Sequence, residues 1–297
     1  MGRRFSRAIL GISIAAVVSL GATRAVGQTP SAAGRAWSPS RTPDGQPDMQ
    51  GFWAKEAGTP PYYENLEEGS EAKHTVMADN VLRRGSAIVD PPDGKVPYQP
   101  WAAAVKQERF KNIHDPNPEV RDPVSTHCFL AGVPRIQYDV APPTFQILQV
   151  PGSVVLLFER QHAYRVIPLD GRPHAPANMK LWMGDSRGRW EGNTLVVDVT
   201  NHNEKPWLDW AGNFHSDALY VVERWTLVSP DKIAYEATIE DRKAYSRPWK
   251  IALAYARNKQ GGYEQMEDAV TRVSRRMPPG MLLARKSFFL KIAGSTR

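Results

Sequence analysis

The chain has 297 residues, a formal net charge of +7 and 41% hydrophobic residues, which is ample for a globular core. Its excess positive charge lies mainly near the two ends rather than across a folded domain, and this distribution argues against nucleic-acid binding. A single cysteine, Cys128, excludes an internal disulfide and a multi-cysteine zinc site.

The first 27 residues have the pattern of a secretory signal peptide. Arg3, Arg4 and Arg7 precede an apolar stretch at 8–22. This stretch is too short to span a bilayer, so a signal peptide fits it better than a membrane anchor does. Small residues follow it, and we expect cleavage before Gln28. Four arginines leave with this segment, so the net charge falls from +7 to +3. The sequence predicts an exported bacterial protein, periplasmic or secreted, with no transmembrane segment in the mature chain.

The next hundred residues show little regular pattern. The region 28–50 is rich in Ser, Pro, Gly and Ala, which predicts a flexible leader. A short helix fits within 72–84, and a clearer one is expected at 101–113, after a proline and before an Asp-Pro-Asn-Pro sequence. These elements predict an irregular, partly helical N-terminal wrap.

Short β-rich runs separated by turn residues begin near residue 142. Apolar alternation is clearest at Leu195, Val197 and Val199. Turns are expected at 184–188 and at 229–232, the second of which predicts a hairpin. Because no helices separate these runs, they favour a mainly β fold, an antiparallel up-and-down barrel or a sandwich, lipocalin-like by analogy. We expect strands over 145–150, 154–159, 164–169, 179–183, 194–200, 219–228, 233–240, 249–256 and 263–267.

A single β-rich domain at 51–270, which includes the wrap, is the simplest organisation. A basic tail follows at 271–297, where seven Lys or Arg residues occur with no acid. The tail fits an amphipathic helix at an anionic lipid surface, and it fits an exposed terminal helix better. The sequence leaves the oligomeric state open.

No strong catalytic motif is present, but three polar clusters lie in the strand-rich half. The first holds His162, Arg165 and His174, and histidine can act as acid, base or metal ligand near neutral pH. An ordinary turn at Asp170-Gly171 explains most of the same cluster. Its three members are therefore candidates for binding a substrate rather than for the chemical step.

The second cluster is the glycine-rich stretch 184–192. Asp185, Arg187 and Glu191 are expected near one rim, where Arg187 can bind an anionic or hydroxylated ligand. Trp190 would form a stacking wall beside it. The alternative is a self-satisfied corner in which Asp185 caps the turn and pairs with an arginine, and the turn-forming residue types favour it.

The third cluster begins at His215 and Asp217. On a strand, these two side chains would point to one face, where the carboxylate could orient the imidazole as a base. Glu223 shares parity with the apolar residues around it, and a buried carboxyl is a reasonable general acid. It could equally pair with an arginine such as Arg247. Arg224, its neighbour, is a further candidate for substrate binding.

A set of short motifs runs through the chain: TPDGQPD at 42–48, GFW at 51–53, GVPR at 132–135, DGRPH at 170–174, GDS at 184–186, WEG at 190–192, HSD at 215–217, ER at 223–224 and YEATIED at 235–241. Together they resemble a large, mostly uncharacterised family of exported bacterial proteins. The resemblance implies an exported β domain that joins these clusters, and it implies no established activity. Members often carry a cysteine-containing segment where this chain has EQME at 264–267, which argues against a cysteine-dependent role.

The leading hypothesis is an exported enzyme, of lyase, isomerase or hydratase type, that acts on an aromatic or cyclic small molecule. Its base would be His215, oriented by Asp217, and its acid Glu223 or Asp185. A non-catalytic ligand-binding protein is the alternative. A metal-assisted hydrolase using His162, His174 and His215 ranks third, and we expect no cofactor otherwise. The tryptophans expected to line a barrel mouth, or to pack a core equally well, are Trp182, Trp190, Trp207, Trp210 and Trp225.

Overall fold

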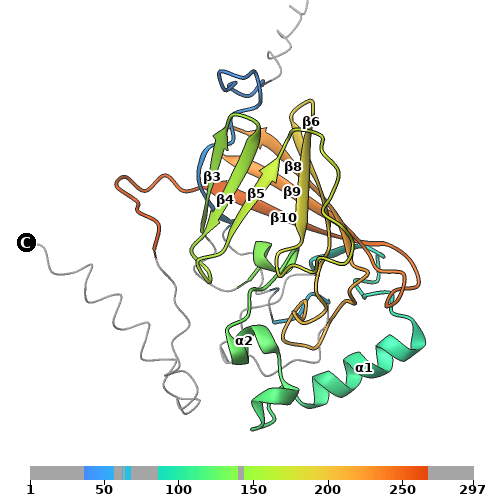
Figure 1. The fold of residues 1–297 in the computed structure, drawn as a ribbon. Helices are drawn as coiled ribbons and strands as arrows, with labels where there is room; N and C mark the ends of the chain where they lie inside the picture. The colour runs from blue at the N-terminus through green and yellow to red at the C-terminus, as the bar shows by residue number, and fades with distance from the viewer. Residues whose placement is uncertain (1–36, 57–61, 63, 68–85, 140–143, 267–297) are drawn as a thin grey trace, which may run out of the picture. The chain divides into compact units, whose positions relative to one another are not determined.

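The computed structural model describes residues 37–56, 62, 64–67, 86–139 and 144–266 (Figure 1). Those described residues that lie from Ser38 onward form one compact unit. The expected signal peptide, the helix within 72–84 and the basic tail lie outside the described residues. Within the expected leader, Met49 is fully buried and accepts a hydrogen bond from the Trp53 indole at 2.8 Å. The last residues of that leader therefore belong to the folded unit.

Two short strands, Gly51–Lys55 and Ile88–Asp90, lie in the region expected to be an irregular wrap, and helices and then a run of strands follow them. The described elements are β1 (Gly51–Lys55), β2 (Ile88–Asp90), α1 (Pro100–Lys111), η1 (Pro118–Val120), α2 (Pro123–His127), η2 (Arg135–Gln137), β3 (Phe145–Val150), β4 (Ser153–Phe158), β5 (Tyr164–Pro168), β6 (Asp185–Glu191), β7 (Thr194–Thr200), β8 (Tyr220–Ser229), β9 (Lys232–Glu240) and β10 (Trp249–Arg257). None of the described helices is long and apolar enough to cross a membrane.

The strands form a nearly closed antiparallel barrel, which confirms the predicted fold class. Nine of them are hydrogen-bonded in the order β5-β4-β3-β1-β10-β9-β8-β7-β6, and β2 pairs separately with β10. Tight turns join β3 to β4, β6 to β7 and β8 to β9, and the last is the hairpin expected at 229–232, where Ser229 pairs with Lys232. Figure 1 shows β5 and β6, the two ends of this order, lying near each other across a seam.

Side chains close the seam between β5 and β6. Gly188 of β6 leaves room for Ile167 of β5, because a Cβ at that glycine would lie 2.6 Å from the isoleucine Cγ2. Nearer the start of both strands, the Arg165 Nη2 donates to the Ser186 Oγ at 3.1 Å. The barrel is thus completed by packing and by one polar bridge at its seam.

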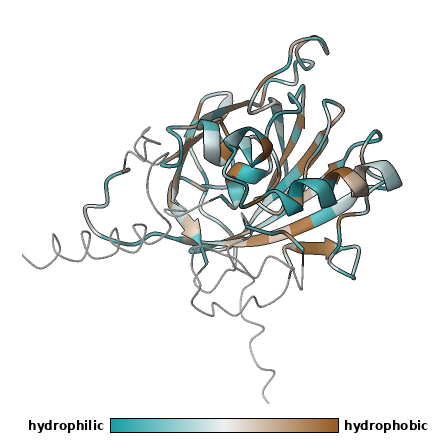
Figure 2. Ribbon diagram, turned by 90° about the horizontal axis from the view of Figure 1, so that it is seen from below, coloured by the Kyte–Doolittle hydropathy of each residue, from teal (hydrophilic) through white to brown (hydrophobic). Residues whose placement is uncertain are grey.

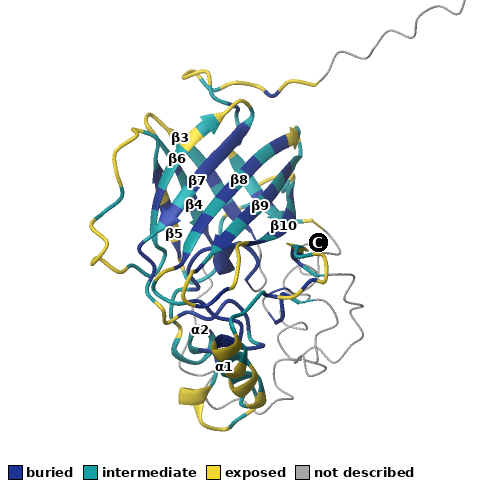
Figure 3. Ribbon diagram, turned by 90° about the vertical axis from the view of Figure 1, so that its right-hand side faces the viewer, coloured by how far each residue is buried: buried dark blue, intermediate teal, exposed yellow. Residues whose placement is uncertain are grey.

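The barrel interior is filled by side chains rather than left open. Buried and half-buried residues alternate along β8, β9 and β10, as Figure 3 shows, because successive strand residues point to opposite faces. Inside, Trp225 stacks on Tyr255 with ring centroids 5.6 Å apart, and Tyr235 packs edge-on against both rings. A ligand therefore has to bind at the wall or at an end of the barrel.

The N-terminal wrap covers one end of the barrel. Figures 1 and 2 show α1, α2 and their connecting segments at this end, and both helices carry hydrophilic residues. Tyr138 donates to the Leu208 carbonyl oxygen at 3.0 Å, and Tyr255 donates to the Gln137 carbonyl oxygen at 3.0 Å. These bonds tie the buried turn η2 to the barrel and to the loop beyond β7. The helix expected at 101–113 is confirmed as α1.

Three expectations about local structure are wrong. Residues 185–188 of the turn expected at 184–188 form the first part of β6 instead, and the turn lies at Gly192, whose φ is +60°. The residues 179–183, expected as a strand, form a loop in which only Leu181 makes a bridge, to His202. The described part of 263–267 is not a strand. Pairing of β6 with the strongly apolar β7 outweighs the turn preference of its Gly, Asp and Ser residues.

Candidate functional site

A pocket of about 410 Å³ lies at the end of the seam where β5 and β6 begin. Its volume falls in the range typical of small-molecule sites. Most of its wall is apolar, and Arg165 is the one charged side chain among the described residues that line it. The lining residues are Leu130, His162, Ala163, Tyr164, Arg165, Val166, Leu181, Trp182, Met183, Gly184 and Ser186.

The tip of the β4–β5 hairpin is pinned against the wrap, and this contact fixes one wall of the pocket. Gln161 accepts from the Ala131 backbone N–H at 2.9 Å and donates to the Phe129 carbonyl oxygen at 2.5 Å. His162 follows with a φ of +49°, a conformation that turns the chain sharply into β5. The opposite wall is held by Trp182, whose ring lies 4.6 Å from that of Phe129.

An ion pair lies directly behind the polar side of the pocket. The Arg165 guanidinium donates to both carboxylate oxygens of Glu223, at 3.1 and 2.5 Å. Tyr235 donates to the same carboxylate at 2.9 Å. The side chains of Arg165 and Glu223 are 1% and 0% exposed, so the pair is shielded from solvent. Such bidentate, charge-assisted bonds are the strong class of protein hydrogen bonds.

The suggested pairing of Glu223 with Arg247 is wrong. Arg247 instead pairs with Asp90 at 2.9 Å on the exposed surface. Glu223 faces the barrel interior, where the arginine of β5 reaches it across the seam. The sequence-based expectation that Glu223 lies among apolar residues is confirmed, since Val221, Trp225 and Leu227 are buried on the same face.

In the second cluster, the alternative hypothesis is confirmed in that Asp185 pairs with an arginine, although the segment is a strand and not a corner. Asp185 accepts from the Ala175 backbone N–H, from His174 Nδ1 and from Arg187 Nη1, each at 2.9 Å. Odd-numbered residues of β6 point outward, so Asp185 and Arg187 face away from the seam pocket. The expected common rim with Glu191 is wrong, because that residue ends the same strand and pairs with Arg189 and Arg224 at 3.1 and 3.0 Å.

The tryptophans do not gather at one barrel mouth, so that expectation is wrong. Trp182 lines the seam pocket, whereas Trp225 packs in the barrel interior. Trp190 shares the inward parity of Ser186 and packs against the core. Trp207 lies under the Arg109 guanidinium, 4.7 Å from its ring centroid. Of the five tryptophans, Trp182 alone is among the described lining residues, which also include Tyr164.

The expected orientation of His215 by Asp217 is wrong. The segment that holds both residues is not a strand, because the Ser216 backbone N–H donates to Asp241 rather than to a ladder partner. Asp217 pairs with Lys243 at 2.6 Å and with Lys180 at 3.6 Å. The His215 Nδ1 instead lies 2.9 Å from the Ser216 carbonyl oxygen. His215 and Asp217 thus bond to other groups and not to each other.

A second buried imidazole stands beside His215. The ring of His202 lies 6.0 Å from it, and burial holds the pKa of His202 well below its usual value. Burial also lowers the pKa of His215. A Cβ at Gly184 would lie 2.7 Å from the His202 Cε1, so this glycine lets the pocket wall pack directly on the imidazole. Both histidines therefore support the wall as neutral groups.

The three histidines of the metal hypothesis do not form a joint site. His162 lines the seam pocket, His174 binds Asp185, and His215 contacts His202. Among the residues that the structure describes, no group of three or more His, Cys, Asp or Glu side chains is arranged to hold a metal ion. The described residues thus offer a pocket with a buried ion pair rather than a metal centre.

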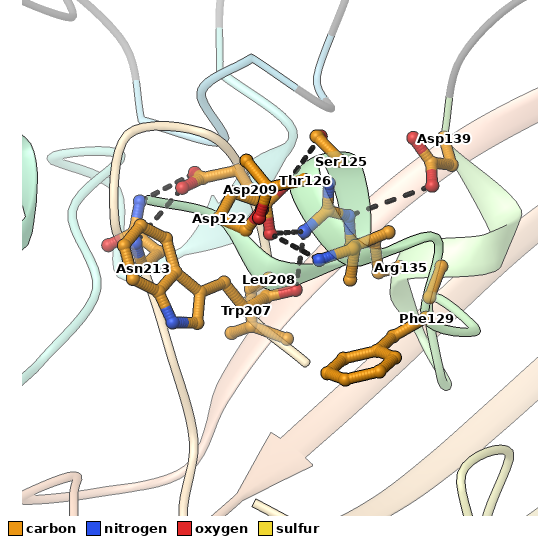
Figure 4. A network of polar contacts seen from close by, with 12 residues as sticks. Asp122, Ser125, Thr126, Phe129, Arg135, Asp139, Trp207, Leu208, Asp209 and Asn213 are labelled. Atoms are coloured by element: carbon orange, nitrogen blue, oxygen red, sulfur yellow. Dashed lines mark hydrogen bonds and ion pairs between the residues drawn. The ribbon is translucent and has the colours of Figure 1, made fainter. Parts of the chain in front are cut away.

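Sequence reasoning missed a buried polar network under the barrel (Figure 4). Arg135 donates to both oxygens of Asp122 at 2.8 Å and to the Trp207 carbonyl oxygen at 2.9 Å. Asp139 lies 3.7 Å from the same guanidinium. Asp122 also caps α2 through the Val124 backbone N–H. The signal in the sequence is a lone arginine between Val133 and Ile136, in an otherwise apolar segment.

Asp209 lies in the same region, and its burial predicts that the stability of the protein depends on pH. It is fully buried and accepts from Leu66 and Asn213, but burial outweighs these bonds and raises its pKa to about 6. The folded state therefore holds this proton more tightly than the unfolded chain, whose aspartate has a pKa near 3.9. The resulting stabilisation is present below about pH 4 and is lost as the pH rises through about 6.

As the pH rises through these values, ionisation of Asp209 should lower the free energy of unfolding by on the order of 3 kcal/mol. This loss is measured as the difference between the wild type and Asp209→Asn in chemical denaturation at a series of pH values. That difference should decrease as the pH rises from about 4 to about 7, because only the wild type has this titrating carboxyl. A difference that stays constant over this range would show that the carboxyl does not take up a proton on folding.

No family model and no curated protein matches the chain. A solved structure of EF1p2_mFAP2b bound to DFHBI is similar to part of it, with 13% sequence identity and a TM-score of 0.21. The match covers 39% of this chain and 79% of that chain. At so low a TM-score it says nothing about this chain's function, and the resemblance by motifs stays a prediction. The candidate site rests on the contacts of this chain alone.

Proposed function

We propose that this protein binds a small, largely apolar molecule in the seam pocket. The observation that carries the proposal is the pocket itself, about 410 Å³ in volume, with apolar walls around a small polar group of His162, Arg165 and Ser186. Binding sites of this kind combine apolar walls with a few fixed polar groups. The signal-like first residues support a place for this activity outside the cytoplasm.

Trp182 is the residue whose loss tests the site most simply. Its ring packs on Phe129 and lines the pocket, so an aromatic ligand gains contact area from it. Trp182→Ala should weaken binding of the neutral fluorescent probe N-phenylnaphthylamine about tenfold, which corresponds to roughly 1.4 kcal/mol. Fluorescence titration of the purified protein measures this change.

The matched control is Trp101→Ala. Trp101 lies on α1, is 49% exposed and does not line the pocket. Its loss should leave the affinity for the probe unchanged. Equal weakening in the two variants, or no binding to the wild type, would contradict the proposal.

Acid–base catalysis on a bound molecule is the second candidate, and one observation favours it. His162 is among the residues that line the pocket, and histidine side chains can act as acid or base near neutral pH. The previously expected set of His215, Asp217, Asp185 and Glu223 does not converge on this pocket. If His162 catalyses a reaction, the wild type and His162→Gln should retain chemically different molecules when purified from the same cells. If mass spectrometry identifies the same retained molecules in both proteins, the result favours binding without catalysis.

A further inference from the structure

The ion pair behind the seam pocket sets the charge that a ligand meets there. Arg165 is the one charged residue of the described lining, and its Nη2 is bonded to Ser186, which lines the pocket as well. Its guanidinium is buried, so water screens it little. An uncompensated charge in this position would act strongly on a ligand, even without direct contact, because the surrounding barrel interior has a low dielectric constant.

Glu223 compensates that charge. Its two carboxylate oxygens accept from both terminal nitrogens of Arg165, and one of them also accepts from Tyr235. Bidentate, charge-assisted bonds from a guanidinium are the pairing that a carboxylate makes. The buried unit of arginine and glutamate therefore carries no net charge.

The other charged groups near the start of the two strands lie outside the described lining of the pocket. Lys180, just before the lining loop, shares Asp217 with Lys243, at 3.6 and 2.6 Å. The Lys205 ammonium lies 5.8 Å from the ring centroid of Trp182. None of these groups changes with a substitution at position 223, so the effect of the glutamate can be measured against a constant surrounding charge.

We propose that Glu223 makes the seam pocket selective for uncharged ligands by cancelling the charge of Arg165. This inference rests on the proposed function, and it narrows the ligand class to neutral molecules with an apolar or aromatic body. Glu223 acts through Arg165 and is a selectivity determinant rather than a ligand contact. A carboxylate ligand would have to compete with Glu223 for the guanidinium.

The test uses two probes of nearly the same shape, the neutral naphthylacetamide and the anionic naphthylacetate, titrated by calorimetry at neutral pH. We expect the wild type to bind the amide more tightly than the acid. Glu223→Gln keeps the shape of the side chain but removes its charge, and should move the ratio of the two dissociation constants towards the acid by about tenfold or more. Binding of the amide should change little.

A second variant covers the case that Glu223→Gln does not fold. The double variant R165M/E223L removes both charges at once, and apolar replacement of a whole buried pair is often tolerated. It should keep the preference for the amide, because the net charge near the pocket is unchanged. A preference for the acid in this variant, or an unchanged ratio in Glu223→Gln, would overturn the inference alone. Failure of the wild type to bind either probe would overturn the proposed function as well.

Discussion

Arg165→Met is expected to lower the free energy of unfolding by about 3–5 kcal/mol. The substitution leaves the Glu223 carboxylate buried, with only Tyr235 as a donor, and it also removes the bond to Ser186 across the seam. Charges buried without a partner are among the most destabilising features that a single substitution can create. Urea denaturation followed by circular dichroism measures the loss.

The double variant R165M/E223L separates the cost of the unpaired Glu223 carboxylate from the cost of lost packing at the seam. If the loss comes from the unpaired carboxylate, removing Glu223 as well should restore most of the stability of the wild type. A single variant that loses less than about 1 kcal/mol would mean that the ion pair contributes little to the closure of the barrel. A double variant as unstable as Arg165→Met would place the loss in packing at the seam instead.

Arg135→Met has the second large expected effect, a loss of about 3–5 kcal/mol in unfolding free energy. It deprives the buried Asp122 of its bidentate partner and the Trp207 carbonyl oxygen of a donor. Because α2, η2 and the loop beyond β7 meet at this guanidinium, we expect the wrap to detach from the barrel first. Hydrogen exchange should show earlier exchange in α2 than in β8 and β9.

Arg247→Met is the matched control for both arginine variants. It also forms a bidentate pair, with Asp90 at 2.9 and 3.2 Å, but this pair lies on the surface. Exposed pairs contribute little because water screens both charges. Its denaturation midpoint should stay close to that of the wild type. A shift as large as that of Arg135→Met would show that burial is not the source of the expected losses.

Sequence patterns predicted the longer strands in which one face is apolar, but they missed the short strands β1 and β2. The runs at 194–200, 219–228, 233–240 and 249–256 all became strands because alternate side chains fill the barrel. The strand β6 escaped this reasoning because its inward positions hold Ser186 and Gly188, which read locally as turn residues. Their small size is needed at the seam, where Ile167 and Arg165 of β5 enter.

The candidate site was less predictable because its partners are distant in sequence. Parity alone indicated that Glu223 is buried, but its partner lies 58 residues away on the far side of the seam. The cluster of His215 and Asp217 failed for the opposite reason, since a spacing of two places side chains together only on a strand. Ser216 bonds to a side chain instead of a ladder partner, so that spacing has no consequence there.

A crystal structure of the wild type soaked with naphthylacetamide would test the central claim most directly. We expect the molecule in the seam pocket, between the ring of Trp182 and the polar side formed by Arg165 and Ser186, with the ion pair to Glu223 intact. Density for the molecule elsewhere on the protein, with the seam pocket empty at a concentration above the measured dissociation constant, would contradict it.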